Sequence, residues 1–211
     1  SGNAAGILTV LYASLLGLPV PFAAVHLLFI NLLTDSLPAI ALGLEPHSDA
    51  VMQEKPRPRS EGILTKPFLL SVGTEGAVIA LATILAFHIG LASGGAAVAS
   101  TMAFATLTLC QLFHAFDVRS ERSSLFHIGV FSNPAMNKAF LIGLTMQLAV
   151  LCVPPLQVVF STVPMSPLEW AVVLALAITP VVVCELAKAV SRGRTRRPAR
   201  AEKVEPACAR R

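Results

Sequence analysis

The feature that most constrains this chain is a series of apolar blocks, each close to the length that crosses a lipid bilayer. A transmembrane helix needs about 20 predominantly apolar residues. Five blocks are of about this length: residues 22–44, 68–87, 97–116, 139–160 and 168–186. A sixth block, residues 4–16, is shorter. Only 13% of the residues are charged, whereas soluble domains carry about 25%. The sequence therefore predicts an all-α membrane protein, a helical bundle of five full transmembrane helices plus the end of a sixth.

The short first block has two interpretations. It begins next to Ser1, in the middle of an apolar run, and this indicates the end of a helix that started earlier. On this interpretation we expect the chain to be a fragment. A secretory signal peptide is the alternative, but signal peptides carry a basic segment before the apolar stretch, and no Lys or Arg precedes this one.

The placement of the sixteen Lys and Arg residues tests the spans independently. They fall between blocks 22–44 and 68–87, between blocks 97–116 and 139–160, and in the tail from Lys188 onward. Basic loops therefore alternate with loops that have no Lys or Arg, as the positive-inside rule requires. We expect a multi-pass integral protein of the plasma membrane with a cytoplasmic C-terminus. The net charge of +4 then reflects topology and contact with membrane lipid, and nucleic acid is not an expected partner.

The chain divides into two parts by composition. We expect residues 1–190 to form one transmembrane domain and residues 191–211 to form a basic cytoplasmic tail. The tail contains few large apolar residues, so we expect it to be disordered. The four cysteines show no paired spacing of the kind that binds metal or forms redox pairs, and we interpret them as small buried hydrophobes.

Asp35 is the residue most indicative of function. It lies thirteen positions after Phe22, which corresponds to a depth of roughly 20 Å along a helix. A carboxylate inside a membrane span is costly and marks a functional site by default. Asn31 lies four residues earlier on the same helical face, and Thr34 adjoins that face. The sequence therefore predicts an ion site centred on Asp35.

Pro38 predicts an irregular backbone beside this carboxylate. A proline has no N–H to bond the carbonyl of Thr34, and its ring disturbs the same turn. We therefore expect the helix to be unwound from Thr34 to Pro38, which would free carbonyl oxygens next to the polar side chains of Asn31 and Asp35. Hard cations such as Ca²⁺ require several oxygen ligands of this kind.

Other polar residues in the spans have competing interpretations. Asn3 and Gln111 would each add an amide oxygen to the site, but an interhelical hydrogen bond explains each of them equally well. The same structural alternative applies to Asn31 and Thr34. We expect Glu75 to have a structural role and His26 to serve helix packing, because His26 lies off the face of Asn31.

The segment from Asn31 to Glu45 resembles the sixth transmembrane helix of the calcium-type (type II) P-type cation-transporting ATPases. It reads Asn-Leu-Leu-Thr-Asp-Ser-Leu-Pro-Ala-Ile-Ala-Leu-Gly-Leu-Glu. Nearly all of the chain before the tail takes part in the resemblance. Residues 3–19 are similar to the end of the fifth helix, residues 101–125 to the eighth, and residues 168–170 to the start of the tenth. On this resemblance, residues 1–190 would be the C-terminal transmembrane domain, from the end of the fifth helix through the tenth.

The resemblance implies that Asn31, Thr34 and Asp35 are ligands of the transported ion, with Asn3 as a ligand from the fifth helix. Ca²⁺ is the expected ion, and Mn²⁺ is its competitor. This chain has Gly6 and Gln111 where the two-site calcium pumps carry glutamates. We therefore expect one ion per cycle.

The resemblance also implies that ion binding and ATP hydrolysis belong to different parts of the pump. The family's Asp-Lys-Thr-Gly phosphorylation motif and its nucleotide domain do not occur in this sequence. Mg-ATP would therefore act only through an N-terminal half, in the same polypeptide or a separate one, and this chain alone would not hydrolyse ATP. The alternatives are a non-catalytic membrane module and an ion-coupled secondary transporter that uses Asp35, although a secondary transporter would be expected to show repeated halves.

Overall fold

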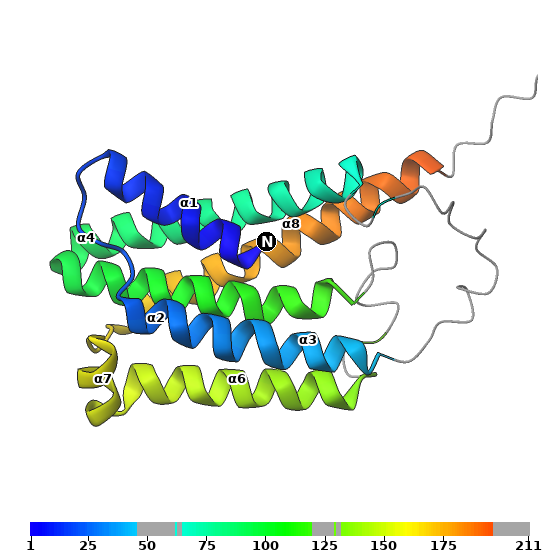
Figure 1. The fold of residues 1–211 in the computed structure, drawn as a ribbon. Coiled ribbons are helices and arrows are strands. Elements are labelled where there is room, and N and C mark those ends of the chain that lie inside the picture. Colours follow the sequence, from blue (N-terminus) through cyan, green and yellow to red (C-terminus); the bar gives the residue numbers. More distant parts are fainter. Residues whose placement is uncertain (46–61, 63–64, 120–128, 130–131, 196–211) are drawn as a thin grey trace, which may run out of the picture.

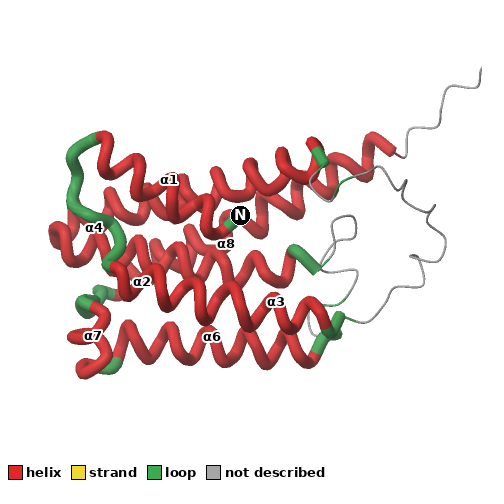
Figure 2. The backbone as a smooth tube through the Cα atoms, in the orientation of Figure 1, coloured by secondary structure: helices red, strands yellow, loops and turns green. Residues whose placement is uncertain are grey.

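The chain forms a bundle of helices that lie side by side (Figures 1 and 2). The computed structural model describes residues 1–45, 62, 65–119, 129 and 132–195. All regular elements in this described part are helical. They are α1 (Gly2–Leu15), α2 (Ala24–Phe29), the π-helix η1 (Ile30–Asp35), α3 (Ser36–Gly43), α4 (Lys66–Asp117), α6 (Pro134–Cys152), α7 (Pro154–Phe160) and α8 (Pro167–Thr195).

Four helical stretches are long and apolar enough to cross a membrane. They are Ala24–Gly43, Phe68–Asp117, Pro134–Cys152 and Pro167–Ala189. The all-helical class and the apolar spans are thus confirmed. The predicted count of five full helices and part of a sixth stays a prediction, because blocks 68–87 and 97–116 lie within one continuous element, α4.

A reversal at Gly95 divides α4 into a first arm (residues 66–94) and a second arm (residues 96–117). Gly95 has φ 79° and ψ −163°, a combination that only glycine adopts without strain. A Cβ atom built on Gly90 would lie 2.6 Å from the Cα atom of Ala99, so the two arms approach closely just beside the reversal. Figure 1 shows the arms running back alongside each other.

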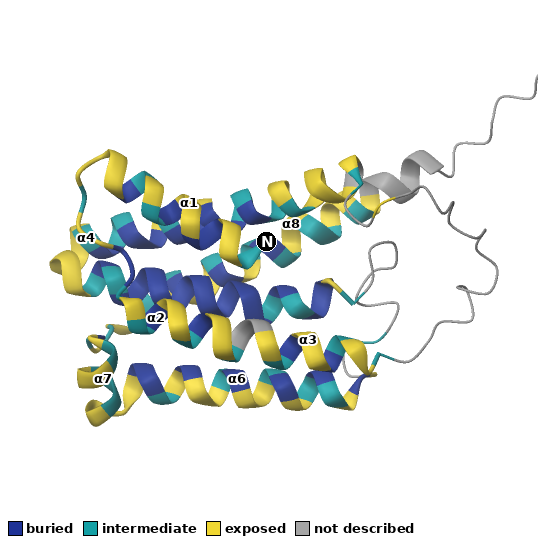
Figure 3. Cartoon of the chain, in the orientation of Figure 1, coloured by how far each residue is buried: buried dark blue, intermediate teal, exposed yellow. Residues whose placement is uncertain are grey.

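The second arm of α4 forms the centre of the bundle. Residues 101–112 are all buried, and Figure 3 shows them as one continuous dark stretch. A helix that is buried on every side packs against neighbours all round. The first arm of α4 and α8 supply a large part of this packing, and the core includes residues of both.

The described basic side chains gather at one end of the bundle, which we call the basic end. Lys66 begins α4, Arg119 follows its last turn, Lys138 lies in the first turns of α6, and Lys188 lies near the end of α8. These helix ends lie together in Figure 1, whereas α7 and the Gly95 reversal lie at the opposite end. The arrangement agrees with the alternation of basic loops, and the cytoplasmic orientation itself stays a prediction.

Two prolines end α6 where the sequence places them. The helix stops at Cys152, Val153 is extended, and Pro154 begins the separate short helix α7. At the other boundary, α8 continues to Thr195, five residues past the predicted start of the tail at residue 191. The rest of the predicted tail, residues 196–211, lies outside the described residues, and the proposed division of the chain into two parts stays a prediction.

Candidate cation site

The predicted ligand segment is a π-helix. Residues Ile30–Asp35 form η1, which is continuous with α2 before it and α3 after it. A π-turn forms i→i+5 hydrogen bonds, is rare, and occurs frequently at functional sites. Three of the four predicted ligands, Asn31, Thr34 and Asp35, therefore lie in the irregular segment of this span.

The expected unwinding from Thr34 to Pro38 is wrong. Ser36–Gly43 is a regular α-helix, and Pro38 is buried within it. The missing N–H and the ring of a proline both act on the carbonyl four residues earlier. The disturbance therefore falls on Thr34, on the N-terminal side of Pro38. There the helix widens into a π-turn and does not break.

Asn31 is exposed on the surface of the described chain, and the side-chain positions of Thr34 and Asp35 lie outside the described part. The backbone carbonyl of Asn31 accepts a hydrogen bond of 3.3 Å from the hydroxyl of Ser36. This five-residue separation matches the wide turn. The segment thus presents an amide side chain and a distorted ladder of carbonyl groups on one element.

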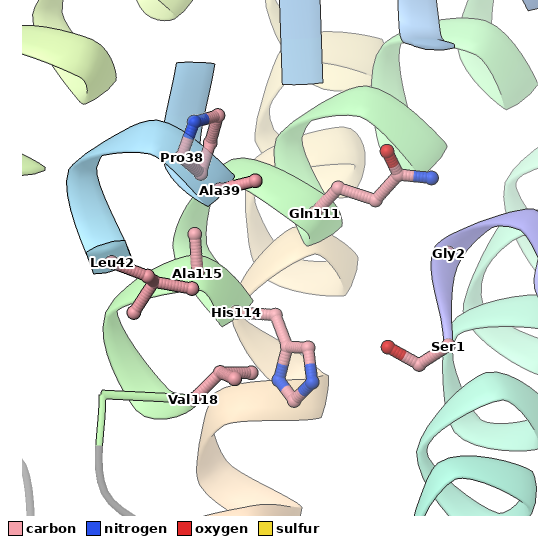
Figure 4. A pocket seen from close by; sticks show the side chains of 9 residues that line it. All are labelled: Ser1, Gly2, Pro38, Ala39, Leu42, Gln111, His114, Ala115 and Val118. Atoms are coloured by element: carbon pink, nitrogen blue, oxygen red, sulfur yellow. The ribbon is translucent and has the colours of Figure 1, made fainter. Parts of the chain in front are cut away.

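A small cavity lies beside this span, between the start of α1, the helix α3 and the second arm of α4. Its volume is about 210 Å³. Figure 4 shows Pro38, Ala39 and Leu42 on one side, Ser1 and Gly2 on the other, and Gln111 and His114 between them. Pro38 follows Asp35 by less than one helical turn, and Gly2 directly precedes Asn3. The cavity thus borders both segments that carry predicted ligands.

The fourth predicted ligand, Asn3, is an exposed residue in the first turn of α1. The two positions where the resemblance led us to expect glutamates in two-site pumps, Gly6 and Gln111, are both buried. Gly6 packs in α1, where an added Cβ would lie 3.7 Å from Leu107, and Gln111 lines the cavity with 7% exposure. The close approach of Gly2 to Gln111 sets the position of this amide, since a Cβ on Gly2 would lie 2.4 Å from Gln111 Nε2.

A group of polar side chains, which we call the Arg119 clamp, fixes the basic end of the span. The Arg119 guanidinium donates to Glu45 at 3.0 Å (Nε–Oε2) and 2.6 Å (Nη2–Oε1). Asn133 Nδ2 donates to Glu45 Oε2 at 2.6 Å and to the Ala41 carbonyl at 3.1 Å. Arg119 also donates to the Gly129 carbonyl at 3.1 Å. Its side chain is only 1% exposed, so the clamp is a buried charged network.

The hydrogen bonds of the Arg119 clamp lower the pKa of Glu45. The hydrogen bonds from Arg119, followed by those from Asn133, hold the pKa of Glu45 below its ordinary value, and they outweigh the opposing effect of partial burial. Glu45 is therefore ionised at neutral pH. The bidentate fork of Arg119 fixes both its carboxylate oxygens.

His26 fixes the other end of the span. Its Nε2 lies 2.6 Å from the carbonyl oxygen of Phe160, at the end of α7, and its ring stacks on Phe104 with centroids 4.3 Å apart. The backbone N–H of Ala23 donates to His26 Nδ1 at 3.2 Å. The predicted packing role of His26 is confirmed.

Sequence reasoning missed the Arg119 clamp. It interpreted Arg119 only as a topological charge and gave no role to Asn133. One local signal was available: Asn133 precedes Pro134, and its side chain accepts hydrogen bonds from Ala135 and Met136 as the N-cap of α6. The pairing with Glu45 has no local signal, because the two residues are 88 positions apart.

Comparison with known proteins identifies a family that matches most of the chain. The family described as "Cation transporting ATPase, C-terminus" matches residues 19–190. The chain therefore belongs to the family of cation-transporting ATPase C-terminal regions. This match includes the π-helix, the clamp and all four candidate spans.

Several relatives with similar sequences are named as calcium-transporting ATPases. The chain is 41% identical over 182 residues to "Calcium-transporting ATPase" of Bacillus subtilis, which covers 85% of this chain and 20% of the relative. It is 37% identical over 207 residues to "Calcium-transporting ATPase 1" of Bacillus cereus, covering 89% and 23%. With human "Calcium-transporting ATPase type 2C member 1" it shares 33% over 195 residues, covering 92% and 21%. The chain thus spans about a fifth of the length of these curated relatives.

The apolar spans and this family membership together make the chain part of an integral membrane protein. Large apolar side chains cover the outside of the span that carries the candidate site. Leu28 and Leu32, for example, are 66% and 69% exposed. Such side chains contact lipid at little cost in a bilayer, whereas in water they would form an adhesive surface.

Proposed function

We propose that this chain supplies the transport-site portion of the membrane domain of an ATP-driven calcium pump. The observation that carries the proposal is the π-helix at Ile30–Asp35, because it lies at the residues chosen from sequence as ligands. The names of the relatives support Ca²⁺ as the transported ion. Oxygen ligands of mixed type also fit Ca²⁺, although Mn²⁺ accepts a similar set.

In this proposal Asp35 supplies the charge of the site, and Asn31, Thr34 and Asn3 supply neutral oxygens. The π-turn would direct backbone carbonyls toward the same ion, because its hydrogen bonds are spaced differently from those of the flanking α-helices. The tied ends of the span leave the π-turn as the segment that can change geometry. Alternating access would then be a change in this turn between two fixed ends.

The proposed stoichiometry is one ion per cycle. Gly6 provides no oxygen ligand from its side chain, and Gln111 provides a neutral amide at the cavity. A second divalent cation would therefore lack the carboxylates that offset its charge. Counting bound ions per phosphorylated pump tests this statement, and a value of two would contradict it.

The proposed partner is the N-terminal portion of the pump, which would bind Mg-ATP, receive the phosphoryl group and add further ligands. The exposure of Asn3 and Asn31 on the described chain supports this proposal, because a transported ion must be enclosed on all sides. The whole protein would reside in the plasma membrane with its basic end in the cytoplasm.

The test is Asp35→Asn in the complete pump. We expect loss of Ca²⁺-dependent phosphorylation by ATP, because the ion would lose its only charged ligand from this span. Glu169→Gln is the matched control. It makes the same carboxyl-to-amide change at a partly exposed residue at the start of α8, where an amide oxygen can still accept a hydrogen bond from Ser93, and we expect it to retain phosphorylation. Calcium-dependent phosphorylation of Asp35→Asn at the wild-type calcium concentration would refute the site.

A further inference from the structure

A second group of ionisable side chains, which we call the His114 cluster, lies where three helical segments meet near the basic end. Glu75 comes from the first arm of α4, His114 and Asp117 from its second arm, and Cys184 and Lys188 from α8. A ring nitrogen of His114, a carboxylate oxygen of Asp117 and Sγ of Cys184 all lie within 4.8 Å of one another. The proposed transport ligands do not include any of these groups.

The geometry determines the tautomer of His114. Its Nε2 lies 3.3 Å from Glu75 Oε2. An ionised carboxylate can only accept a hydrogen bond, so Nε2 carries the hydrogen. In a neutral imidazole the other nitrogen, Nδ1, then presents a lone pair.

The lone pair of His114 Nδ1 faces another acceptor. Nδ1 is buried without a hydrogen-bond partner in the described part of the chain, and it lies 4.0 Å from Asp117 Oδ2. The side chain of His114 is only 5% exposed and that of Asp117 only 3%. Two buried acceptors that face each other repel unless a proton or a metal cation lies between them. This arrangement is the second, independent indication of a ligand.

The carboxylates near His114 also favour a cation at this point. Three described carboxylates, those of Glu75, Asp117 and Glu185, belong to this region, and the ammonium of Lys188 lies 2.7 Å from Asp117 Oδ1 and 3.4 Å from Glu185 Oε1. Lys188 bonds to Oδ1 of Asp117, whereas Oδ2 is the oxygen nearer to His114 Nδ1, so a cation at this point would contact Oδ2.

We propose that His114, Asp117 and Cys184 bind a borderline-soft divalent cation of the Zn²⁺ class. Nitrogen, carboxylate and thiolate ligands suit Zn²⁺, and the sulfur selects against Ca²⁺. Glu75 then has the role of a carboxylate that orients a metal-binding histidine through its other nitrogen. On binding, the Cys184 proton leaves to solvent and the thiolate bonds to the metal.

The cavity beside the transport segment gives access to this site. His114 is among the residues that line it, and Figure 4 shows the imidazole ring projecting into it. Water in the cavity would fill the fourth position of a tetrahedral ion. A bound ion would join both arms of α4 to α8, so it would stabilise the packing that supports the transport span.

The test measures Zn²⁺ binding to the purified full-length protein, without an affinity tag, in a Cys152→Ser, Cys208→Ser background. Competition with a chromophoric chelator should give one Zn²⁺ per chain, unaffected by excess Ca²⁺. Co²⁺ in place of Zn²⁺ should produce thiolate charge-transfer absorption in the near ultraviolet. We expect Cys184→Ser to abolish this absorption and to weaken binding by at least about 100-fold, and Glu75→Gln to weaken it by about 10- to 100-fold.

A conservative variant separates ligand loss from misfolding. Cys184→His keeps a ligand at this position, so it should retain Zn²⁺ binding while losing the thiolate absorption. Wild-type affinity in Cys184→Ser would show that an ion binds elsewhere and would overturn the proposal. Failure of the background protein to bind Zn²⁺ would also overturn it. Asp35→Asn should bind Zn²⁺ normally, so this result is independent of the transport proposal.

Discussion

The span from Ala24 to Gly43 combines two kinds of region, tied ends and an irregular middle. At the opposite end of the bundle from the basic residues, His26 bonds to Phe160 and stacks on Phe104. At the basic end, Glu45 just beyond the span is held by Arg119 and Asn133. Between these ends lies η1, where Asn31 is exposed. On the proposed function, stabilising contacts and ion binding would lie in separate parts of one helix.

The hydrogen bonds that hold this span lie at its two ends, and its distorted backbone, η1, lies in the middle. A transport segment needs two geometries of similar free energy, and fixed ends limit the change to a few residues. The comparison therefore predicts that substitutions at the ends lower the stability of the protein, whereas substitutions that act on the middle change ion affinity. Four measurements examine this separation.

The largest expected effect is that of Glu45→Ala. It leaves the buried Arg119 without its carboxylate, and breaking a buried charge pair costs about 3–5 kcal/mol. Because Glu45 is 22% exposed, we expect a loss near the lower limit, about 3 kcal/mol. The measurement is the free energy of unfolding by denaturant titration in mixed micelles. Leu44→Ala, at an exposed neighbouring residue, is the control, and equal losses in the two variants would contradict the role of the clamp.

His26→Ala should cost less, about 2 kcal/mol, because it leaves the Phe160 carbonyl without this donor and removes a stacked ring. The same titration measures it. Leu28→Ala, in the same short helix but exposed, should change the free energy of unfolding by less than about 0.5 kcal/mol. If His26→Ala left stability unchanged but altered calcium affinity, the division between ends and middle would be wrong.

Pro38→Ala should act on the middle. It restores the N–H that can bond the Thr34 carbonyl, so the α-helix can continue and η1 loses its cause. We expect the calcium concentration for half-maximal phosphorylation of the complete pump to rise about tenfold, a change of about 1.4 kcal/mol in binding. Pro180→Ala, at a proline within α8, is the control. An unchanged calcium dependence in Pro38→Ala would show that η1 does not depend on this proline.

The smallest expected effect is a pH dependence at the clamp. The pKa of Glu45 is lowered in the folded protein, so its pairing with Arg119 stabilises the protein above the ordinary carboxyl pKa. This contribution should decline as the pH falls below that value and disappear as the pH passes through the lowered pKa. The check is the free energy of unfolding against pH, compared with Glu45→Gln. In that variant the acid-dependent component assigned to residue 45 should be missing.

The architecture was largely predictable because burial in lipid leaves a strong signal in composition. The apolar blocks are helical, although block 139–160 is divided into α6 and α7 just before Pro154. The position of the reversal at Gly95 was harder to predict from sequence, because the preceding Gly94 is an equally good candidate for the turn residue. Only the packing of Gly90 against Ala99 shows why the turn lies where it does.

The backbone irregularity in this span was predictable in position but not in form. The missing N–H of Pro38 indicates an irregularity near Thr34, but it does not distinguish a broken helix from a widened one. That choice depends on whether the neighbouring helices keep the span continuous, which is tertiary information. The His114 cluster was not predicted for a related reason. Glu75 and Cys184 have no distinctive sequence pattern, and only the packing of α4 against α8 brings them close to His114.

The Arg119 clamp has a consequence for biogenesis. Arg119 follows Glu45 by 74 residues along the chain, and Asn133 follows it by 88. A nascent chain that has just inserted the span from Ala24 to Gly43 therefore has neither Arg119 nor Asn133 available to Glu45 until two further stretches of apolar sequence have emerged from the ribosome. During that interval the Arg119 clamp is absent, and His26 lacks its hydrogen bond to Phe160, which emerges later still. Ribosome-bound intermediates stalled before residue 119 should therefore be recognised by membrane quality-control proteases, and those stalled after residue 160 should resist them.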